Sequence, residues 1–156
     1  MMKWLPIALT LLLSACSSTP KKTYYQLQAL GMPAPVSSGA STRELWLEHI
    51  FVADYLMQNG VVFQTNDVQY VIAQNNLWAS PLDQQLQQTL VTNLSSALPG
   101  WVISSQPMSR NQDVLNVSIS GFHGRFDGKA VIRGEWILNH QGRLIKRPFN
   151  LELKQS

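Results

Sequence analysis

The sequence contains a single cysteine and few charged side chains. Cys16 is the only cysteine among 156 residues, so no disulfide can form within one chain and the fold must depend on packing. Charged residues make up 13% of the chain, and a formal net charge of +3 is too small to indicate nucleic-acid binding. Internal repeats and low-complexity tracts are also missing. An apolar share of 45% is nevertheless sufficient for one hydrophobic core.

The common signatures of catalysis and metal binding are missing as well. The sequence has no Gly-x-Ser-x-Gly nucleophile elbow and no phosphate-binding glycine loop. His49, His123 and His140 are not spaced as metal ligands and have no cysteine partner. Glu44 and Glu48 could pair as catalytic carboxylates, but two solvated strand residues are the simpler interpretation. We therefore predict a protein that is not an enzyme, with no catalytic residue and no metal.

The one marked apolar run lies at the N-terminus. Residues 4–13 are mostly apolar and follow Lys3, as in the basic and apolar regions of a secretory signal peptide. At about ten residues the run is too short to remain as a membrane-spanning helix, which needs roughly 20. It ends in Leu13-Ser14-Ala15-Cys16, which resembles the lipobox of bacterial lipoproteins. We predict a signal peptide over residues 1–15, with cleavage between Ala15 and Cys16.

Cys16 is the predicted lipidation site. The resemblance implies a diacylated sulfur and an acylated new N-terminus, and acyl chains contribute about 0.8 kcal/mol per buried CH₂. Several chains on one residue would hold the protein on a membrane, and this covalent lipid is the only prosthetic group expected. Ser17 follows the cysteine where Asp would retain such a lipoprotein at the inner membrane. This implies the periplasmic face of the outer membrane. An ordinary signal peptide with a chance cysteine is the alternative.

The mature chain is predicted to hold a lipidated tether over residues 16–22 and a single periplasmic domain over residues 23–156. The composition of residues 31–42 predicts a loop. Alternating polarity predicts eight strands: Thr23–Ala29, Arg43–Ala53, Val61–Thr65, Val68–Ala73, Trp101–Ser104, Asp113–Phe122, Lys129–Leu138 and Arg143–Leu153.

One amphipathic helix is predicted from Pro81 to Leu98. Ser80 is a suitable N-cap, and Asp83 follows it as in a capping box. Leucine recurs every four residues from Leu82 to Leu98, which gives an apolar stripe that winds slowly round the helix. Packing against a sheet would bury this stripe.

Turn residues indicate how the strands pair. Asn66-Asp67 is compatible with a tight hairpin between the strands on either side, and Asp127-Gly128 predicts another. Pro148 cannot donate a ladder hydrogen bond, so the last strand should lie at an edge or contain a bulge. The predicted fold class is α+β, with an antiparallel, meander-rich sheet and the helix over residues 81–98 packed on one face.

Aromatic side chains supply the only candidate binding surface. The mature chain has four tryptophans, for which packing in the core and hairpins is the simplest interpretation: Trp46, Trp78, Trp101 and Trp136. The alternative is that Tyr55, Leu56, Met57 and Trp78 form an apolar patch for a partner or a lipid.

Several segments resemble the auxiliary lipoproteins of ABC-type transport systems. The Trp-Ala-x-Pro-Leu block over residues 78–82 is the most specific of them. The others are Asp54-Tyr55-Leu56, residues 60–65, 70–73, 76–83 and 98–101, Gly134-Glu135-Trp136 and residues 138–142. Within this family the chain is similar to the branch of the paraquat-inducible (Pqi) system.

The resemblance implies an outer-membrane-anchored accessory subunit of a Pqi-like intermembrane lipid transport system. Its partner would be an MCE (mammalian cell entry) domain protein that bridges the envelope, and a symmetric homo-oligomer is compatible with the ring shape of such assemblies. The alternative function is a lipid-binding periplasmic carrier. Relatives continue past the last strand into a C-terminal helix that this sequence is expected to lack, which would leave part of the sheet uncovered.

Overall fold

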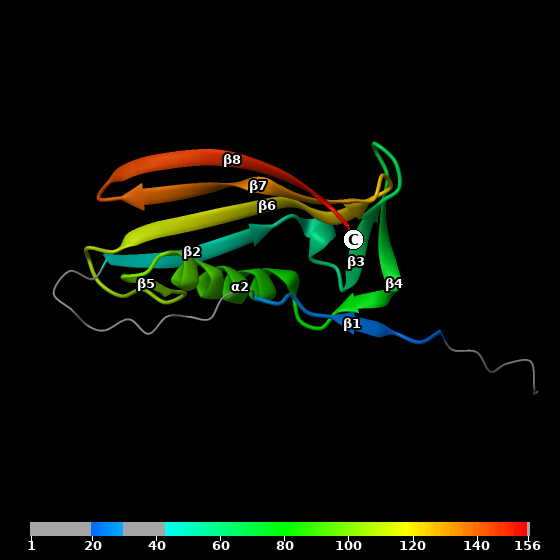
Figure 1. Ribbon diagram of the computed structural model, residues 1–156, viewed down its shortest axis with the longest axis horizontal. Helices are drawn as coiled ribbons and strands as arrows, with labels where there is room; N and C mark the ends of the chain where they lie inside the picture. The colour runs from blue at the N-terminus through cyan, green and yellow to red at the C-terminus, as the bar shows by residue number, and fades with distance from the viewer. Residues whose placement is uncertain (1–19, 30–42, 156) are drawn as a thin grey trace, which may run out of the picture.

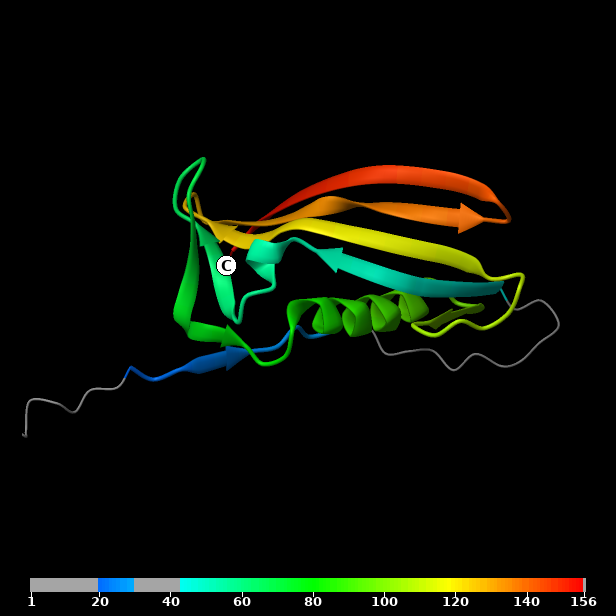
Figure 2. The same ribbon diagram turned by 180° about the vertical axis from the view of Figure 1, so that it is seen from behind.

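The computed structural model describes residues 20–29 and 43–155, which form a mixed eight-stranded sheet with one long helix (Figures 1 and 2). Its elements are β1 (Thr23–Tyr25), β2 (Arg43–Val52), the short 3₁₀ helix η1 (Asp54–Leu56), β3 (Gly60–Gln64), β4 (Tyr70–Trp78), α2 (Leu82–Ala97), β5 (Trp101–Ser104), β6 (Asp113–Arg125), β7 (Lys129–His140) and β8 (Arg143–Lys154). In these ranges no helix combines the length and the hydrophobicity needed to cross a membrane.

Several predictions fall outside the described residues. These are the signal peptide, the cleavage site at Ala15, the lipidation site at Cys16 and the loop over residues 31–42. They stay predictions, as does the lack of a C-terminal helix.

β6 lies at the centre of the sheet and is paired on both edges. On one edge it pairs with β7, which pairs in turn with β8. On the other edge, β2 pairs with the first half of β6, and β3 pairs with its last two residues. η1 forms the corner between β2 and β3, where the Ala53 N–H donates to the carbonyl of Ile119 at 3.0 Å. Figure 1 shows the consequence: β3 and β4 stand across one end of the long strands.

The prediction of an antiparallel sheet is wrong for four of the seven strand pairings. β2 runs parallel to β5 and β6, β3 runs parallel to β6, and β1 runs parallel to β4. Alternating polarity identifies the residues that share a face, but it carries no information about the direction of the neighbouring strand. The antiparallel pairs are those between strands that follow each other directly in the chain, and they include the pairing of Asp113–Phe122 with Lys129–Leu138 across the predicted Asp127-Gly128 turn. The structure is compatible with the α+β class.

α2 packs on the sheet face formed by β2 and β5. Leu82 and Leu86 are buried in the main core, and Leu90 and Val91 pack at its edge, which confirms the predicted apolar face over the first half of the helix. The buried members of this core are Leu47, Leu56, Val62, Leu82, Leu86, Val117 and Ile119.

The predicted N-cap of the helix is wrong. Pro81 occupies the N-cap position, and no described side chain caps the helix there. The carbonyl of Ser80 instead accepts a hydrogen bond from the Gln85 side chain at 2.7 Å. The Asp83 carboxylate accepts the N–H of Gln84 at 2.8 Å, so the capping box does not form. Proline suits a helix start because its missing N–H would have no intrahelical acceptor.

A β-bulge in β2 changes which residues face the core. The register against β6 shifts between Leu47 and His49, so Glu48 is the extra residue. Before the bulge Leu47 faces α2, and after it Ile50 and Val52 pack against the same core. Unbroken alternation would place Leu47 and His49 on one face, and the bulge separates them.

Two strand boundaries also differ from the predicted ones. β1 ends at Tyr25 because the N–H of Leu27 donates to the Gln85 side chain at 2.7 Å instead of to a neighbouring strand. The β3–β4 connection spans residues 65–69, since Asn66 Oδ1 accepts two backbone N–H groups of this loop at 3.0 Å.

The prediction for Pro148 is confirmed. Among the described strands, β8 pairs with β7 and with no other. Its outer edge therefore has no ladder that the missing N–H of Pro148 could interrupt.

Leu47 provides the most direct test of this core. Leu47 is 0% exposed, whereas Leu144 on β8 is 68% exposed. We expect Leu47→Ala to lower the free energy of unfolding by about 2–5 kcal/mol, because it removes buried atoms and leaves a cavity. Leu144→Ala should change it by about 0.5 kcal/mol or less. Urea unfolding followed by tryptophan fluorescence measures both, and equal losses in the two variants would contradict the assignment of the core.

Candidate functional site

The structure separates the four residues of the predicted apolar patch. Leu56 is completely buried because η1 turns its side chain into the core, so its assignment to a surface patch is wrong. Trp78 is half-buried, with its ring centroid 6.0 Å from that of Phe122. Tyr55 is half-buried and donates its hydroxyl to the carbonyl of Ser120. Of the four, only Met57 is exposed.

A larger apolar surface lies on β6, β7 and β8, on the same side of the sheet as α2. The strand register identifies its members, because residues directly opposite each other in neighbouring strands share a face. Leu138 lies opposite Leu115 and Ile145, and Ile132 lies opposite Phe122 and Leu151. We call this surface the open face; its apolar members are Leu115, Phe122, Ile132, Trp136, Leu138, Ile145, Phe149, Leu151 and Leu153. Arg147 shares this face on β8, opposite Trp136.

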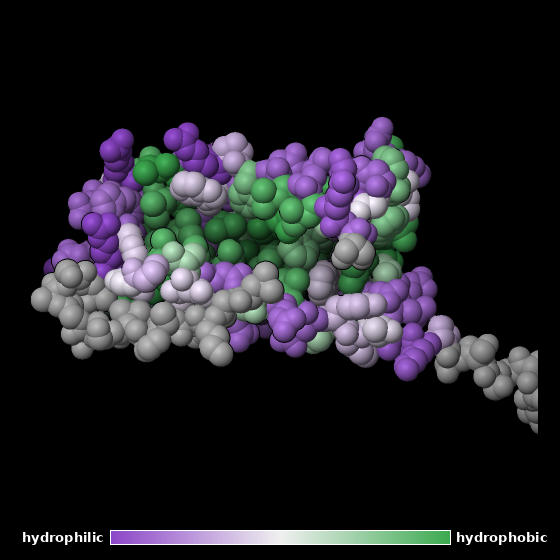
Figure 3. Space-filling model, in the orientation of Figure 1, coloured by the Kyte–Doolittle hydropathy of each residue, from purple (hydrophilic) through white to green (hydrophobic). Residues whose placement is uncertain are grey.

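The open face is only partly covered. α2 packs mainly on β2 and β5, and Figure 3 shows hydrophobic side chains filling a hollow between α2 and the β7–β8 edge. Leu151 and Leu153 are 50% and 51% exposed. Trp136 and Phe149 pack against the core from this side, so the open face continues the core beyond the helix. A contiguous exposed apolar surface of this kind marks a binding surface.

Gly134 leaves room for the close approach of the Phe149 ring within this surface. A Cβ at position 134 would overlap the carbonyl oxygen of Ser118 and lie 3.0 Å from the ring of Phe149. Glycine is therefore the residue that this close approach of β6, β7 and β8 requires.

A polar pocket borders the open face where β2 and β6 begin and β7 ends. Its volume is about 470 Å³, and its lining includes Arg43, Glu44, Trp101, Ser109, Asp113 and His140. Asp113 and Leu115 are two residues apart on β6, as are His140 and Leu138 on β7, and residues two apart in a strand point to the same face. This part of the pocket therefore lies on the same side of the sheet as the open face.

Side chains in the polar pocket carry both signs of charge. The buried carboxylate of Asp113 lies 2.8 Å from His140 Nδ1. The Arg43 guanidinium carbon lies 5.6 Å from the ring centroid of Trp101, and Glu44 accepts a hydrogen bond from Ser109. These residues are far apart in the sequence, and the ends of four strands bring them together. Sequence reasoning missed this pocket because no local spacing connects its members.

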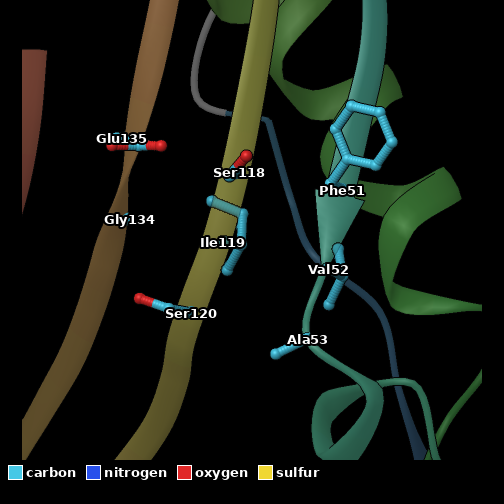
Figure 4. Close-up of a pocket in the computed structure, with 8 residues that line it drawn as sticks. All are labelled: Phe51, Val52, Ala53, Ser118, Ile119, Ser120, Gly134 and Glu135. Atoms are coloured by element: carbon cyan, nitrogen blue, oxygen red, sulfur yellow. The ribbon is translucent and has the colours of Figure 1, made fainter.

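A second hollow lies on the face of the sheet opposite α2. Its volume is about 390 Å³, and Figure 4 shows α2 behind the strands that line it. The ring of Phe51 forms one wall, and Ser118, Ser120 and Glu135 supply its polar groups. Its lining holds no cation, so it has no group that would neutralise an anion.

The predicted carboxylate and histidine candidates have separate surroundings. Glu44 bonds to Ser109, whereas the Glu48 carboxylate lies 3.6 Å from the exposed ring of His49. In the part of the chain that the structure describes, no three His, Cys, Asp or Glu side chains are grouped to hold a metal ion.

His123 is the one buried histidine of the described residues, at 5% exposure. Its Nε2 lies 3.1 Å from Gln64 Oε1, and the ring of Tyr70 meets it edge-on at 5.0 Å. Its Nδ1 is buried and has no partner among the described atoms. Burial lowers the pKa of His123, and the positive charges of Arg133 and Arg125 lower this pKa further.

An exposed ion-pair cluster closes the β6–β7 turn. Arg125 bonds to Asp127 at 2.8 Å and to Glu152 at 3.0 Å, and Lys129 lies 3.3 Å from Glu152. Hydrogen bonds from Arg125 lower the pKa of both carboxyl groups. Surface pairs of this kind contribute little to stability, so the cluster mainly fixes the geometry of the turn.

Comparison with known proteins gives concordant results for sequence and structure. The family model of the ABC-type transport auxiliary lipoprotein component matches residues 25–156. The chain is 57% identical over 157 residues to the "Intermembrane transport lipoprotein PqiC" of Escherichia coli (strain K12), and equally to that of Shigella flexneri. Each alignment covers 100% of this chain and 84% of the relative.

Two solved structures have a similar fold. The crystal structure of an uncharacterized protein has a TM-score of 0.78 and 64% identity, and the match covers 88% of this chain and 82% of that protein. A crystal structure from Xanthomonas campestris has a TM-score of 0.66 at 18% identity, over 86% of this chain and 79% of that protein. At this identity the second match supports the fold alone.

The lowered pKa of His123 predicts a loss of stability in mild acid. Because the folded protein binds this proton less readily than the unfolded chain does, stability is full above about pH 6.5 and falls as the pH decreases toward the folded pKa. We expect a lower free energy of unfolding at pH 5.5 than at pH 7.5, measured by urea unfolding. Both values lie above the range in which Asp127 and Glu152 titrate.

Two variants separate this effect from other titrations. His123→Gln should reduce the difference between the two pH values, whereas His49→Gln, at an exposed histidine, should keep the wild-type difference. An unchanged difference in His123→Gln would contradict the assignment.

Proposed function

The chain belongs to the family of ABC-type transport auxiliary lipoproteins, and we propose that it is the outer-membrane-anchored accessory subunit of a Pqi-like intermembrane lipid transport system. The observation that carries this proposal is 57% identity over the whole chain to lipoproteins named for intermembrane transport. These relatives are named as transport lipoproteins and not as enzymes.

The proposed anchor is the lipid on Cys16, at the periplasmic face of the outer membrane. The exposed residues 20–22 lead from the predicted tether into β1, and β1 lies at one outer edge of the sheet. Figure 1 shows β1 beside the β3–β4 end of the molecule, away from the end where β2 and β6 begin. The anchor would therefore hold the β3–β4 end near the membrane and leave the polar pocket further from it.

The proposed partner is an MCE-domain protein of the Pqi-like system. The open face supplies an apolar surface of the kind that binding partners cover. A ring-shaped partner also favours several copies of the chain arranged with the same symmetry. In this account the domain docks on the periplasmic end of the partner and supports the passage of lipid to or from the outer membrane.

The arrangement of polar groups favours binding over catalysis. In the polar pocket Ser109 donates to Glu44, and His140 pairs with Asp113. The hydroxyl and the imidazole thus engage different carboxylates, and a serine nucleophile requires an adjacent base.

Fractionation of envelopes tests the proposed anchor. We expect the wild-type chain in the outer-membrane fraction and Cys16→Ala in soluble or unprocessed form, because no acyl chain can be attached. The matched change Ser17→Asp keeps the cysteine and should move the lipoprotein to the inner membrane. Recovery of Cys16→Ala in the outer membrane at the wild-type level would contradict lipid anchoring.

Affinity purification from envelopes in mild detergent tests the proposed partner. We expect an MCE-domain protein to co-purify with the wild-type chain. Its absence, with the chain itself intact and lipidated, would contradict the accessory role.

A further inference from the structure

We propose that the polar pocket and the open face together bind one zwitterionic phospholipid, with the headgroup in the pocket and an acyl chain along β7 and β8. This proposal rests on the proposed transport function, in which the protein meets phospholipid. Its geometry comes from the described residues alone.

The open face has the length that an acyl chain requires. From Leu138 to Ile132 it follows β7 for about 20 Å, and from Ile145 to Leu153 it follows β8 for about 26 Å, at roughly 3.3 Å per residue. Arg147 is the one charged residue within this length of β8 on that face. One leaflet of a bilayer holds its acyl chains within about 15 Å, half of the hydrocarbon thickness. A chain lying in the hollow of Figure 3 would contact both strands and the adjacent side of α2.

The polar pocket fits a headgroup that carries both a phosphate and an ammonium group. In the described part of the chain neither Arg43 nor Glu44 has an ion-pair partner. Arg43 would bind the phosphate, because guanidinium groups form paired hydrogen bonds with phosphate oxygens. Glu44 would face the ammonium group, whereas the buried Asp113 is already bonded to His140. Arg143 lies opposite His140 on β8, at the same end of the sheet, and adds positive charge there.

A purely anionic headgroup matches the pocket less well. Phosphatidylglycerol would supply the phosphate, but it would leave Glu44 without a positive partner. The structure therefore assigns the site to phosphatidylethanolamine in preference to phosphatidylglycerol.

The continuity of the two surfaces favours a lipid over a protein helix. An apolar helix or a second copy of this chain would cover the open face without using the charges of the pocket. A phospholipid uses both surfaces, because its polar and apolar parts are joined end to end. The hollow around Phe51 offers no comparable site, since its lining has no cation to bind a phosphate.

Native mass spectrometry of the delipidated full-length protein tests the proposal. The protein is mixed with vesicles of palmitoyl-oleoyl phosphatidylethanolamine or phosphatidylglycerol and then transferred to mild detergent. We expect one phosphatidylethanolamine per chain and at least fivefold less phosphatidylglycerol. No bound phospholipid would overturn the proposal, and equal binding of the two lipids would overturn the headgroup assignment.

Three variants locate the lipid. Arg43→Gln and Leu151→Glu should each weaken phosphatidylethanolamine binding at least tenfold, since they remove the phosphate partner and place a charge in the open face. Leu144→Glu is the matched control: Leu144 is on the same strand but faces the opposite side of the sheet, so binding should be unchanged. Circular dichroism confirms that each variant is folded.

The pattern of losses separates the competing occupants. Wild-type binding in Leu151→Glu and Arg43→Gln would overturn the site. If Leu151→Glu changed only the oligomeric state and no lipid were bound, the open face would be a protein interface and the proposal would fail. Recovery of the MCE-domain protein from envelopes is measured with the same variants, so a failure of lipid binding is distinguished from a failure of the proposed transport role.

Discussion

One helix is too narrow to cover five neighbouring strands, and this difference in width determines which part of the sheet is left exposed. β5, β2, β6, β7 and β8 lie side by side, and at about 4.8 Å between strands their axes span roughly 19 Å. One helix is only about 10–12 Å across with its side chains, so α2 covers β5 and β2, and no other element of residues 20–29 and 43–155 forms a layer over β7 and β8. The core around Leu47, Leu82 and Val117 forms beneath the helix, and the same apolar surface continues beyond it as the open face.

Pairing of β6 on both edges holds the two halves of the sheet together. β2 and β3 occupy one edge in succession, with η1 at the corner, while β7 occupies the other edge along its whole length. The corner buries Leu56 and closes one end of the core, and the opposite end gathers Arg43, Asp113 and His140 in the polar pocket. The molecule thus has an apolar surface with a charged site at one end, which suits a ligand with the same two parts.

The features that sequence analysis predicted are those that depend on local chemistry. Asp127-Gly128 marks a true turn with Gly128 at φ +82°, Pro148 lies on an edge strand, and the leucine stripe identifies the helix. Strand direction could not be predicted, because a parallel and an antiparallel neighbour require the same alternation of side chains. The bulge at Glu48 was missed for a related reason: it exists only relative to the register of β6.

Less of the candidate site than of the fold could be predicted from the sequence. Sequence analysis groups Leu56 with Tyr55 and Met57 in a possible surface patch, yet the turn of η1 directs it inward. The pocket residues come from β2, β5, β6, β7 and the β5–β6 loop, so only the assembled sheet shows that they are neighbours. The opposite holds for the lipobox at Cys16. It can be recognised in the sequence, but it lies outside the residues that the structure describes.

Photo-crosslinking tests most directly whether the surface left open by α2 is a lipid site. The probe is phosphatidylethanolamine with a diazirine in its acyl chain, and mass spectrometry of peptides locates the products. The account predicts labels on β7 and β8 at residues of the open face. Labels confined to the opposite side of the sheet, around Phe51, or no labels at all would contradict it.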